Sequence, residues 1–117
     1  MISVGTDIVK VSRIKALIDQ KKEKFLNKIF TEEEITYCNS YSAPELHFSG
    51  KYAAKEAVKK ALLSNGLIEQ ISLKDIEIVN KNNKAPYVVI KDMMELNYNL
   101  SVSHEEGYAI AFVVIEK

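Results

Sequence analysis

Hydrophobic and polar positions alternate every second residue at the start of the chain. Ile2, Val4, Thr6 and Ile8 alternate with Ser3, Gly5 and Asp7. A period of two is typical of a β-strand, because successive side chains point to opposite faces. The pattern predicts a strand with one bulky face and one face of small residues that ends in Asp7. We expect this second face to have room for a ligand.

The next segment changes to a helical period. Apolar residues on one side of the predicted helix are Ile14, Leu17, Ile18, Phe25 and Ile29. Ser12 is the expected cap of this helix. Further along, Thr31 and Glu34 have the spacing of a capping box, in which the hydroxyl and the carboxylate satisfy free amides at a helix start. The box predicts a short helix through about Cys38.

The longest predicted element begins near Pro44, a residue suited to the first turn of a helix, and runs through Leu63. Gly66 is its expected C-terminal cap. Small side chains share one narrow stripe of this helix, so that another element can approach it closely. They are Gly50, Ala53, Ala54, Ala57 and Ala61.

The remainder of the chain returns to a period of two residues. Strands are expected over residues 71–79 and 87–90, with a turn over 81–86 between them. A short helix is expected over residues 92–97. Residues 100–104 and 108–115 should form a hairpin through Glu105-Glu106-Gly107. Without a linker or a repeat in the sequence, residues 1–117 are predicted to form a single domain.

Composition and charge narrow the classes of protein. The 117 residues are 47% hydrophobic, which is enough to bury the core of one domain. Sixteen basic residues balance 16 acidic residues, which argues against a dedicated nucleic-acid binder. A small nucleic-acid-binding domain that uses the basic residues between 21 and 28 is the alternative, and it predicts steeply salt-dependent binding.

Two further features bear on the compartment. The longest apolar run, residues 109–115, is far short of the roughly 20 residues that span a membrane, so no membrane insertion is expected. The single cysteine, Cys38, cannot form an internal disulfide, and the first residues do not form a signal peptide. These features predict a cytoplasmic protein, with Cys38 a small core residue rather than a nucleophile.

Two acidic residues stand among small or apolar side chains. Asp7 lies on the first strand, and Glu56 lies inside the small-residue helix. Two carboxylates from separate elements can hold a hard dication such as Mg²⁺, with open positions for water and phosphate. Lys60, on the helical face of Glu56, could neutralise a metal-bound phosphate. The structural alternative is that Asp7 caps a turn while Glu56 pairs with Lys60.

Two other residues are candidates for binding. His104 ends an apolar strand beside Ser103, where both a structural and a catalytic role are open. Arg13 follows the strand of Asp7 closely and is well placed to face a partner protein. The run Lys21-Lys22-Glu23-Lys24 is either a solvated helix face or a second source of charge for an acidic partner.

Three blocks of sequence, in this order, resemble the holo-acyl-carrier-protein synthases, the small bacterial class of 4'-phosphopantetheinyl transferases. The blocks are Gly5-Thr6-Asp7-Ile8-Val9 with Arg13, Phe48 to Ala57 followed by Lys60-Ala61-Leu62, and Ser101-Val102-Ser103-His104. The resemblance covers nearly the whole chain. Lys51 stands where that family commonly has arginine, and Lys84 stands where a glycine often precedes the proline of the turn.

The resemblance implies a reaction and a fold. The reaction is transfer of 4'-phosphopantetheine from coenzyme A to a serine of apo acyl carrier protein, with release of adenosine 3',5'-bisphosphate, in support of fatty acid biosynthesis. The implied fold is α+β, the 4'-phosphopantetheinyl transferase fold, with a long helix packed on a small antiparallel sheet. The implied assembly is a homotrimer with sites between subunits. A catalytically silent carrier-protein or nucleotide-binding module on the same fold is the alternative.

The resemblance also implies roles for residues of this chain. Asp7 and Glu56 would bind magnesium, and Lys60 would contact the coenzyme A diphosphate. His104, from the neighbouring subunit, and Lys51 would hold the 3'-phosphate. Either Glu56 or a metal-bound water beside it would take the serine proton. Arg13 would face the acidic carrier protein.

Overall fold

The computed structural model describes residues 1–82 and 85–117. Its elements, in chain order, are β1 (Ile2–Lys10), α1 (Val11–Lys21), α2 (Glu23–Ile29), α3 (Glu32–Asn39), α4 (Pro44–Ser64), the 3₁₀ helix η1 (Leu73–Asp75), β2 (Glu77–Asn80), β3 (Pro86–Val89), β4 (Asn97–Glu105) and β5 (Tyr108–Glu116). Residues 83 and 84 lie outside the described residues, and so does part of the turn expected over residues 81–86.

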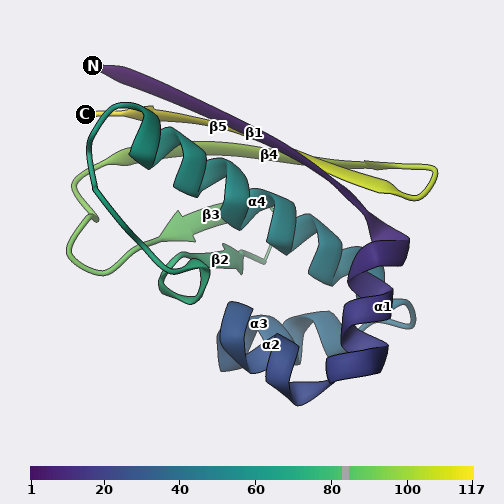
Figure 1. Cartoon of the computed structure of the whole chain (residues 1–117). Helices are drawn as coiled ribbons and strands as arrows, with labels where there is room; N and C mark the ends of the chain where they lie inside the picture. Colours follow the sequence, from purple (N-terminus) through teal and green to yellow (C-terminus); the bar gives the residue numbers. More distant parts are fainter. Residues whose placement is uncertain (83–84) are drawn as a thin grey trace.

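The long helix α4 packs against a three-stranded sheet in the order β1-β5-β4, and the β2–β3 hairpin lies beside it (Figure 1). Each pair of neighbouring strands is antiparallel. The short helices α1, α2 and α3 gather around the first half of α4 (Figure 1). This arrangement is the α+β fold that the sequence predicts. Within the described residues, no helix is long and apolar enough to cross a membrane.

The ends of two helices form as their sequences indicate. Pro44 occupies the first turn of α4, and Gly66 follows its end with a φ of +66°. At the start of α3, the amide of Glu34 donates to the Thr31 hydroxyl at 3.3 Å. The amide of Thr31 donates to the Glu34 carboxylate at 2.8 Å. The capping box is therefore confirmed.

Small residues bring β1 and α4 into close contact. Ser3 and Gly5 are buried, and the Ser3 hydroxyl donates to the carbonyl of Ala61. A Cβ on Gly5 would lie only 2.9 Å from the carbonyl carbon of Ala57 and 3.0 Å from the amide nitrogen of Ala61. The prediction of a ligand space on the small-residue face of β1 was wrong, because α4 fills that space. Asp7 also lies within β1 rather than at its end.

The opposite face of the sheet carries large apolar side chains. Ile2, Val4 and Ile8 of β1 and Tyr108, Ile110 and Phe112 of β5 are exposed there, and we call these six residues the outer sheet face. Ile8 is 62% exposed and its pairing partner Ile110 is 45% exposed. The apolar half of the alternation in β1 therefore faces away from the core of the single chain.

The helical segment after β1 is two helices rather than one. Lys22 has a φ of +48°, which separates α1 from α2. Helix α1 begins at Val11, with Lys10 at the cap position, so the prediction that Ser12 caps the helix was wrong. A non-glycine residue in this conformation breaks the helix without a sequence signal, because lysine is an ordinary helix former.

Two predictions for the second half of the chain also differ from the structure. Residues 71–79 form η1 followed by the short strand β2, not one strand. The spacing from Leu73 to Ile76 is three residues, which is the repeat of a 3₁₀ turn. No helix forms over residues 92–97: residues 92–96 form turns, with Asp92 at a φ of +67°, and Asn97 begins β4. The C-terminal hairpin of β4 and β5 is confirmed.

Candidate active site at the α4 and β1 seam

Asp7 and Lys60 meet where β1 crosses the second half of α4. The Lys60 ammonium donates to the Asp7 carboxylate at 3.0 Å and to the carbonyl of Thr6 at 3.1 Å. The Asp7 side chain is 14% exposed and the Lys60 side chain 56% exposed. Asp7 reaches this position because it shares the inner face of β1 with Gly5, which lets the helix approach.

This contact decides between the two arrangements left open by the sequence. Among the ion pairs of the described residues, Lys60 pairs with Asp7 across the seam and not with Glu56 along the helix. Asp7 is held by a partner on α4 rather than capping a turn. The structural alternative was therefore wrong in both of its parts.

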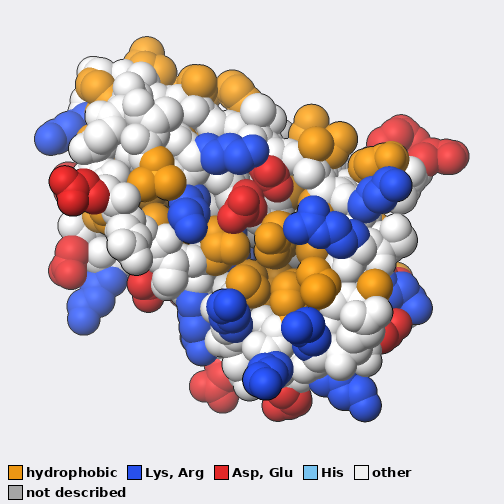
Figure 2. All heavy atoms as spheres, in the orientation of Figure 1, with side chains coloured by type: hydrophobic (Ala, Val, Ile, Leu, Met, Phe, Trp, Pro, Cys, Tyr) orange, Lys and Arg blue, Asp and Glu red, His pale blue; other side chains and the backbone are white. Residues whose placement is uncertain are grey.

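Glu56 and Arg13 belong to the same cluster. Burial raises the pKa of the Tyr52 phenol, and the nearby carboxylate of Glu56 raises it further. The guanidinium of Arg13 lowers the pKa of Tyr52, and the carboxylate of Asp7 raises it. These three charged groups, from β1, α1 and α4, thus lie close enough to Tyr52 to affect the pKa of its hydroxyl. Figure 2 shows acidic side chains on this face, bordered by basic ones and lying next to a hydrophobic patch between α4 and the short helices.

The sequence reasoning missed Tyr52. Its ring stacks on Phe25 of α2, with centroids 6.5 Å apart and planes at 28°. It lies one helical turn before Glu56 on α4, and this four-residue spacing is a signal that could have found it. Through the Phe25 contact, α2 supports the wall of the carboxylate cluster.

The donor set of the cluster fits a hard dication as a partial site. Asp7 and Glu56 are carboxylates from two separate elements, and the ammonium of Lys60 already lies against one of them. Magnesium typically takes one or two carboxylates and keeps several waters or substrate phosphates. In the described part of the chain, no group of three or more histidine, cysteine, aspartate or glutamate side chains could enclose a metal ion. The protein ligands available for a dication at this site are therefore the two carboxylates of Asp7 and Glu56.

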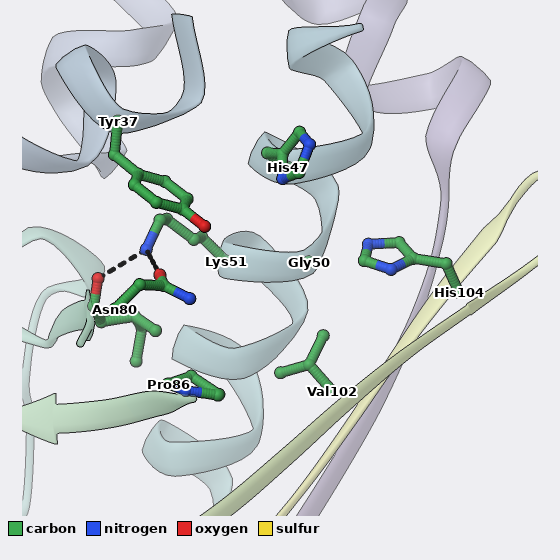
Figure 3. Close-up of a pocket in the computed structure, with 9 residues that line it drawn as sticks. Tyr37, His47, Gly50, Lys51, Asn80, Pro86, Val102 and His104 are labelled. Carbon is green, nitrogen blue, oxygen red and sulfur yellow. Dashed lines mark hydrogen bonds between the residues drawn. The ribbon is translucent and has the colours of Figure 1, made fainter. Parts of the chain in front are cut away.

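His104 and Lys51 lie at a second place, near the first half of α4. A cavity of about 180 Å³ is lined by Tyr37, His47, Gly50, Lys51, Ile78, Asn80, Pro86, Val102 and His104. Figure 3 shows His104 projecting from β4 toward Gly50, with Lys51 and Asn80 on the other side of the cavity. The structure thus brings these two predicted residues to one cavity.

Gly50 allows His104 to lie against the helix. A Cβ on Gly50 would be 3.0 Å from Nε2 of His104. The same nitrogen lies 3.0 Å from the carbonyl oxygen of Leu46. A carbonyl can only accept, so Nε2 of His104 carries the proton in this contact.

The two groups of predicted residues are separate within one chain. Gly50 at the cavity and Glu56 at the seam are six residues apart on α4, which is about 9 Å along the helix axis. The seam holds Asp7, Glu56 and Lys60. The cavity holds Lys51 and His104.

These features define a class of protein: a small α+β domain with a carboxylate pair and a lysine at the seam between its long helix and its sheet. The model of the 4'-phosphopantetheinyl transferase superfamily matches residues 3–113, and the chain belongs to this family. The resemblance noted from the sequence is confirmed.

Individual relatives cover the whole domain. The holo-[acyl-carrier-protein] synthase of Thermodesulfovibrio yellowstonii is 46% identical over 112 residues, and the match covers 96% of each chain. The structure of Helicobacter pylori holo-[acyl-carrier-protein] synthase in complex with coenzyme A has 32% identity and a TM-score of 0.83, over 97% of this chain and 99% of the other. The Neisseria meningitidis synthase has 30% identity and a TM-score of 0.85 over all of both chains.

Proposed function

We propose that this protein transfers the 4'-phosphopantetheine group from coenzyme A to a serine of apo acyl carrier protein, in support of fatty acid biosynthesis. The observation that carries the proposal is the contact of Lys60 with Asp7 beside Glu56, on a fold shared with relatives named as holo-acyl-carrier-protein synthases. The products are holo acyl carrier protein and adenosine 3',5'-bisphosphate.

In the proposed reaction, the serine oxygen forms a bond to the β-phosphorus of coenzyme A. The bond from that phosphorus to the bridging oxygen breaks, and the electron pair leaves with adenosine 3',5'-bisphosphate. Charge neutralisation and alignment dominate such a transfer, so a protein nucleophile is not needed. Lys60 places its positive charge at the diphosphate, and Glu56 or a neighbouring water accepts the serine proton.

Asp7 and Glu56 are the proposed ligands of Mg²⁺. When bound, the ion would supply charge neutralisation and orientation for the diphosphate. Asp7 suits this role because it is mostly buried and already attracts a cation, the ammonium of Lys60. Lys60 is mostly exposed, so its long side chain can turn from Asp7 toward a phosphate without disturbing the core.

The 3'-phosphate of coenzyme A is proposed to bind at His104, from the neighbouring subunit of a homotrimer. Two observations support shared sites. Within one chain, His104 of β4 lies against the first half of α4 at Leu46, whereas Asp7 and Lys60 meet at its second half. The outer sheet face exposes six large apolar side chains, and contiguous apolar surface of this kind marks an interface.

Arg13 is the proposed contact for the acidic carrier protein. It is exposed on α1 and close enough to Tyr52 to affect the pKa of that hydroxyl. A carrier that docks on α1 would therefore bring its serine toward Asp7 and Glu56.

We also propose a cytoplasmic location, on the basis of the single cysteine and the expected partners.

The test is the intact mass of an apo acyl carrier protein after incubation with coenzyme A, Mg²⁺ and this protein. We expect the mass to rise by one 4'-phosphopantetheine group. Asp7→Asn and Glu56→Gln should each lower the rate at least about a hundredfold while the protein stays folded. Glu69→Gln, at an exposed glutamate of the loop after α4, is the matched control and should keep full activity.

Two results would contradict the proposal. If either seam variant transferred the group at the wild-type rate with the metal fully chelated, Asp7 and Glu56 would not be the metal ligands of the site. Binding of coenzyme A without any transfer to the carrier would identify the chain as a silent binding module on the same fold.

A further inference from the structure

Two lysines of α4 lie inside the protein rather than on its surface. Lys51 is 5% exposed and Lys55 is 0% exposed. They are one helical turn apart, so their side chains leave the helix on the same side. Both reach the segment from η1 to the end of β2. We call these two lysines together with Glu34 the internal brace.

Lys55 anchors the beginning of this segment. Its ammonium donates to the carbonyls of Leu73 at 3.0 Å and Ile76 at 2.7 Å, and it pairs with the Glu34 carboxylate at 2.7 Å. The other oxygen of Glu34 accepts the amide of Ile78 at 2.8 Å. Burial lowers the pKa of Lys55 and Glu34 opposes that shift.

Lys51 anchors the end of the segment. Its ammonium donates to the carbonyl of Ile78 and to the side-chain oxygen of Asn80, both at 2.7 Å, and it lies 4.6 Å from the centroid of the Tyr37 ring. An ammonium has three N–H donors, so two are bonded and the third faces an aromatic ring. Figure 3 shows the amine directed at Asn80 and away from His104.

The bonded backbone belongs to an edge of the β2–β3 hairpin. Within the described residues β2 has one strand partner, β3, and the brace binds backbone groups of β2 from the side of α3 and α4. Ile78 is held at both its amide and its carbonyl. The hairpin supplies Ile78, Asn80 and Pro86 to the wall of the cavity that also holds His104. The brace therefore sets where that wall stands relative to α4.

From this geometry we infer that Lys51 is a positioning residue of the coenzyme A cavity, acting through Ile78 and Asn80, and does not contact a phosphate itself. A phosphate contact would require its ammonium to give up two short hydrogen bonds at a buried position. Loss of such bonds leaves buried acceptors without partners, which is costly. The inference rests on the proposed function, because it takes this cavity to bind coenzyme A.

The kinetic test compares coenzyme A with dephospho-coenzyme A in Lys51→Met and Asn80→Leu. If Lys51 positions the wall, each variant raises KM for both substrates by the same factor, about tenfold, with kcat within about twofold of wild type. The double variant should be no worse than the larger single one, because both changes break one contact. Lys15→Met, at an exposed lysine of α1, should change neither constant.

Three kinetic results would overturn the inference. A rise in KM confined to coenzyme A would identify a phosphate contact. A fall in kcat at unchanged KM would identify a general loss of folded protein. Wild-type kinetic constants in Asn80→Leu would show that Lys51 does not act through Asn80. Asn80→Leu leaves the lysine in place, so it decides the question even if Lys51→Met does not fold.

A second measurement is independent of catalysis. Hydrogen exchange followed by mass spectrometry should show residues 77–80 exchanging about tenfold faster in Lys51→Met, with β1 and β5 unchanged. Unchanged exchange over residues 77–80 would overturn the inference. If the wild-type protein shows no transferase activity, the proposed function fails, and the exchange result still decides the role of Lys51.

Discussion

Replacement of Gly5 by alanine tests how the seam between β1 and α4 places the site. The new Cβ would lie 2.9 Å from the carbonyl carbon of Ala57 and 3.0 Å from the amide nitrogen of Ala61, and closer still to the carbonyl oxygen of Ala57. All three are main-chain atoms, so no side-chain rotation relieves the overlap. The strand and the helix must separate.

The size of the effect follows from these distances. Ordinary contact of a Cβ begins near 3.4 Å, so the carbonyl carbon alone requires about 0.5 Å of widening and the nearer carbonyl oxygen requires more than about 1 Å. Overpacking of this kind costs about 3 kcal/mol, at the upper end of the usual range, because backbone must move. A melting temperature about 10 °C lower is expected for a domain of this size. Asp7 lies on the same face of β1, so its 3.0 Å contact with Lys60 lengthens too. We expect activity to fall by about ten- to a hundredfold.

Thermal unfolding checks the predicted loss of stability, and transferase rates measured below the melting temperature check the predicted loss of activity. Gly66→Ala is the matched control: its φ is +66° and nothing lies within 4 Å of an added Cβ, so it should lose about 1 kcal/mol and no activity. Adding Ala57→Gly to Gly5→Ala should give no rescue, because the overlap involves the Ala57 backbone. A Gly5→Ala protein that melts within about 2 °C of wild type and is fully active would refute the reasoning.

Four further predictions concern other parts of the molecule. His104→Ala should raise KM for coenzyme A about tenfold and leave KM for dephospho-coenzyme A nearly unchanged. An equal rise for both substrates would show that His104 does not contact the 3'-phosphate. Arg13→Glu should weaken binding of the carrier protein in low-salt calorimetry, whereas an unchanged affinity would make Arg13 structural. Phe112→Glu places a charge on the outer sheet face and should convert a sedimenting trimer to monomer; a trimer that persists would place the interface elsewhere. Burial raises the pKa of Cys38 from 9.0 to about 12, so at pH 8 its thiolate is about a thousandfold rarer than in unfolded protein, and rapid labelling of the native thiol would contradict this.

The parts of the fold that the sequence predicted depend on local signals. The Thr31 and Glu34 capping box, the Pro44 start of α4 and the C-terminal hairpin are each specified by residues a few positions apart. The parts it missed depend on distant contacts. The alternation in β1 shows two different faces, but it does not show that the small-residue face packs on α4 and the bulky face is exposed.

The same distinction applies to the site. Asp7 and Glu56 could be chosen because each is an acid in a small-residue setting, but the partner of Lys60 lies 53 residues away in sequence. The resemblance implied that Lys51 and His104 hold the same 3'-phosphate from different subunits, whereas the structure places both in one cavity of a single chain. The partners of Lys51 were equally hidden, because Ile78 and Asn80 are far along the chain and carry no charge.

The buried lysines did leave one signal in the sequence. Phe48, Val58 and Leu62 are buried on one stripe of α4, with the three- and four-residue spacing of a core face, and Lys51 and Lys55 occupy the two intervening positions of that stripe. A lysine in a core position must find acceptors, because an unpaired buried charge is too costly to keep. The α4 stripe therefore requires carbonyls and a carboxylate opposite it, and the segment from η1 to β2 with Glu34 supplies them.

The two halves of the site should consequently fail in different ways. The carboxylate seam depends on small volume, since Gly5 and Ala57 let β1 and α4 touch, and one added methyl group separates Asp7 from its partners on the helix. The cavity wall depends on charge, since the internal brace holds the edge of β2 through ammonium groups, and a side chain of similar size without charge would release it. Variants that change volume should therefore lower kcat through the seam, and variants that remove charge should raise KM through the wall.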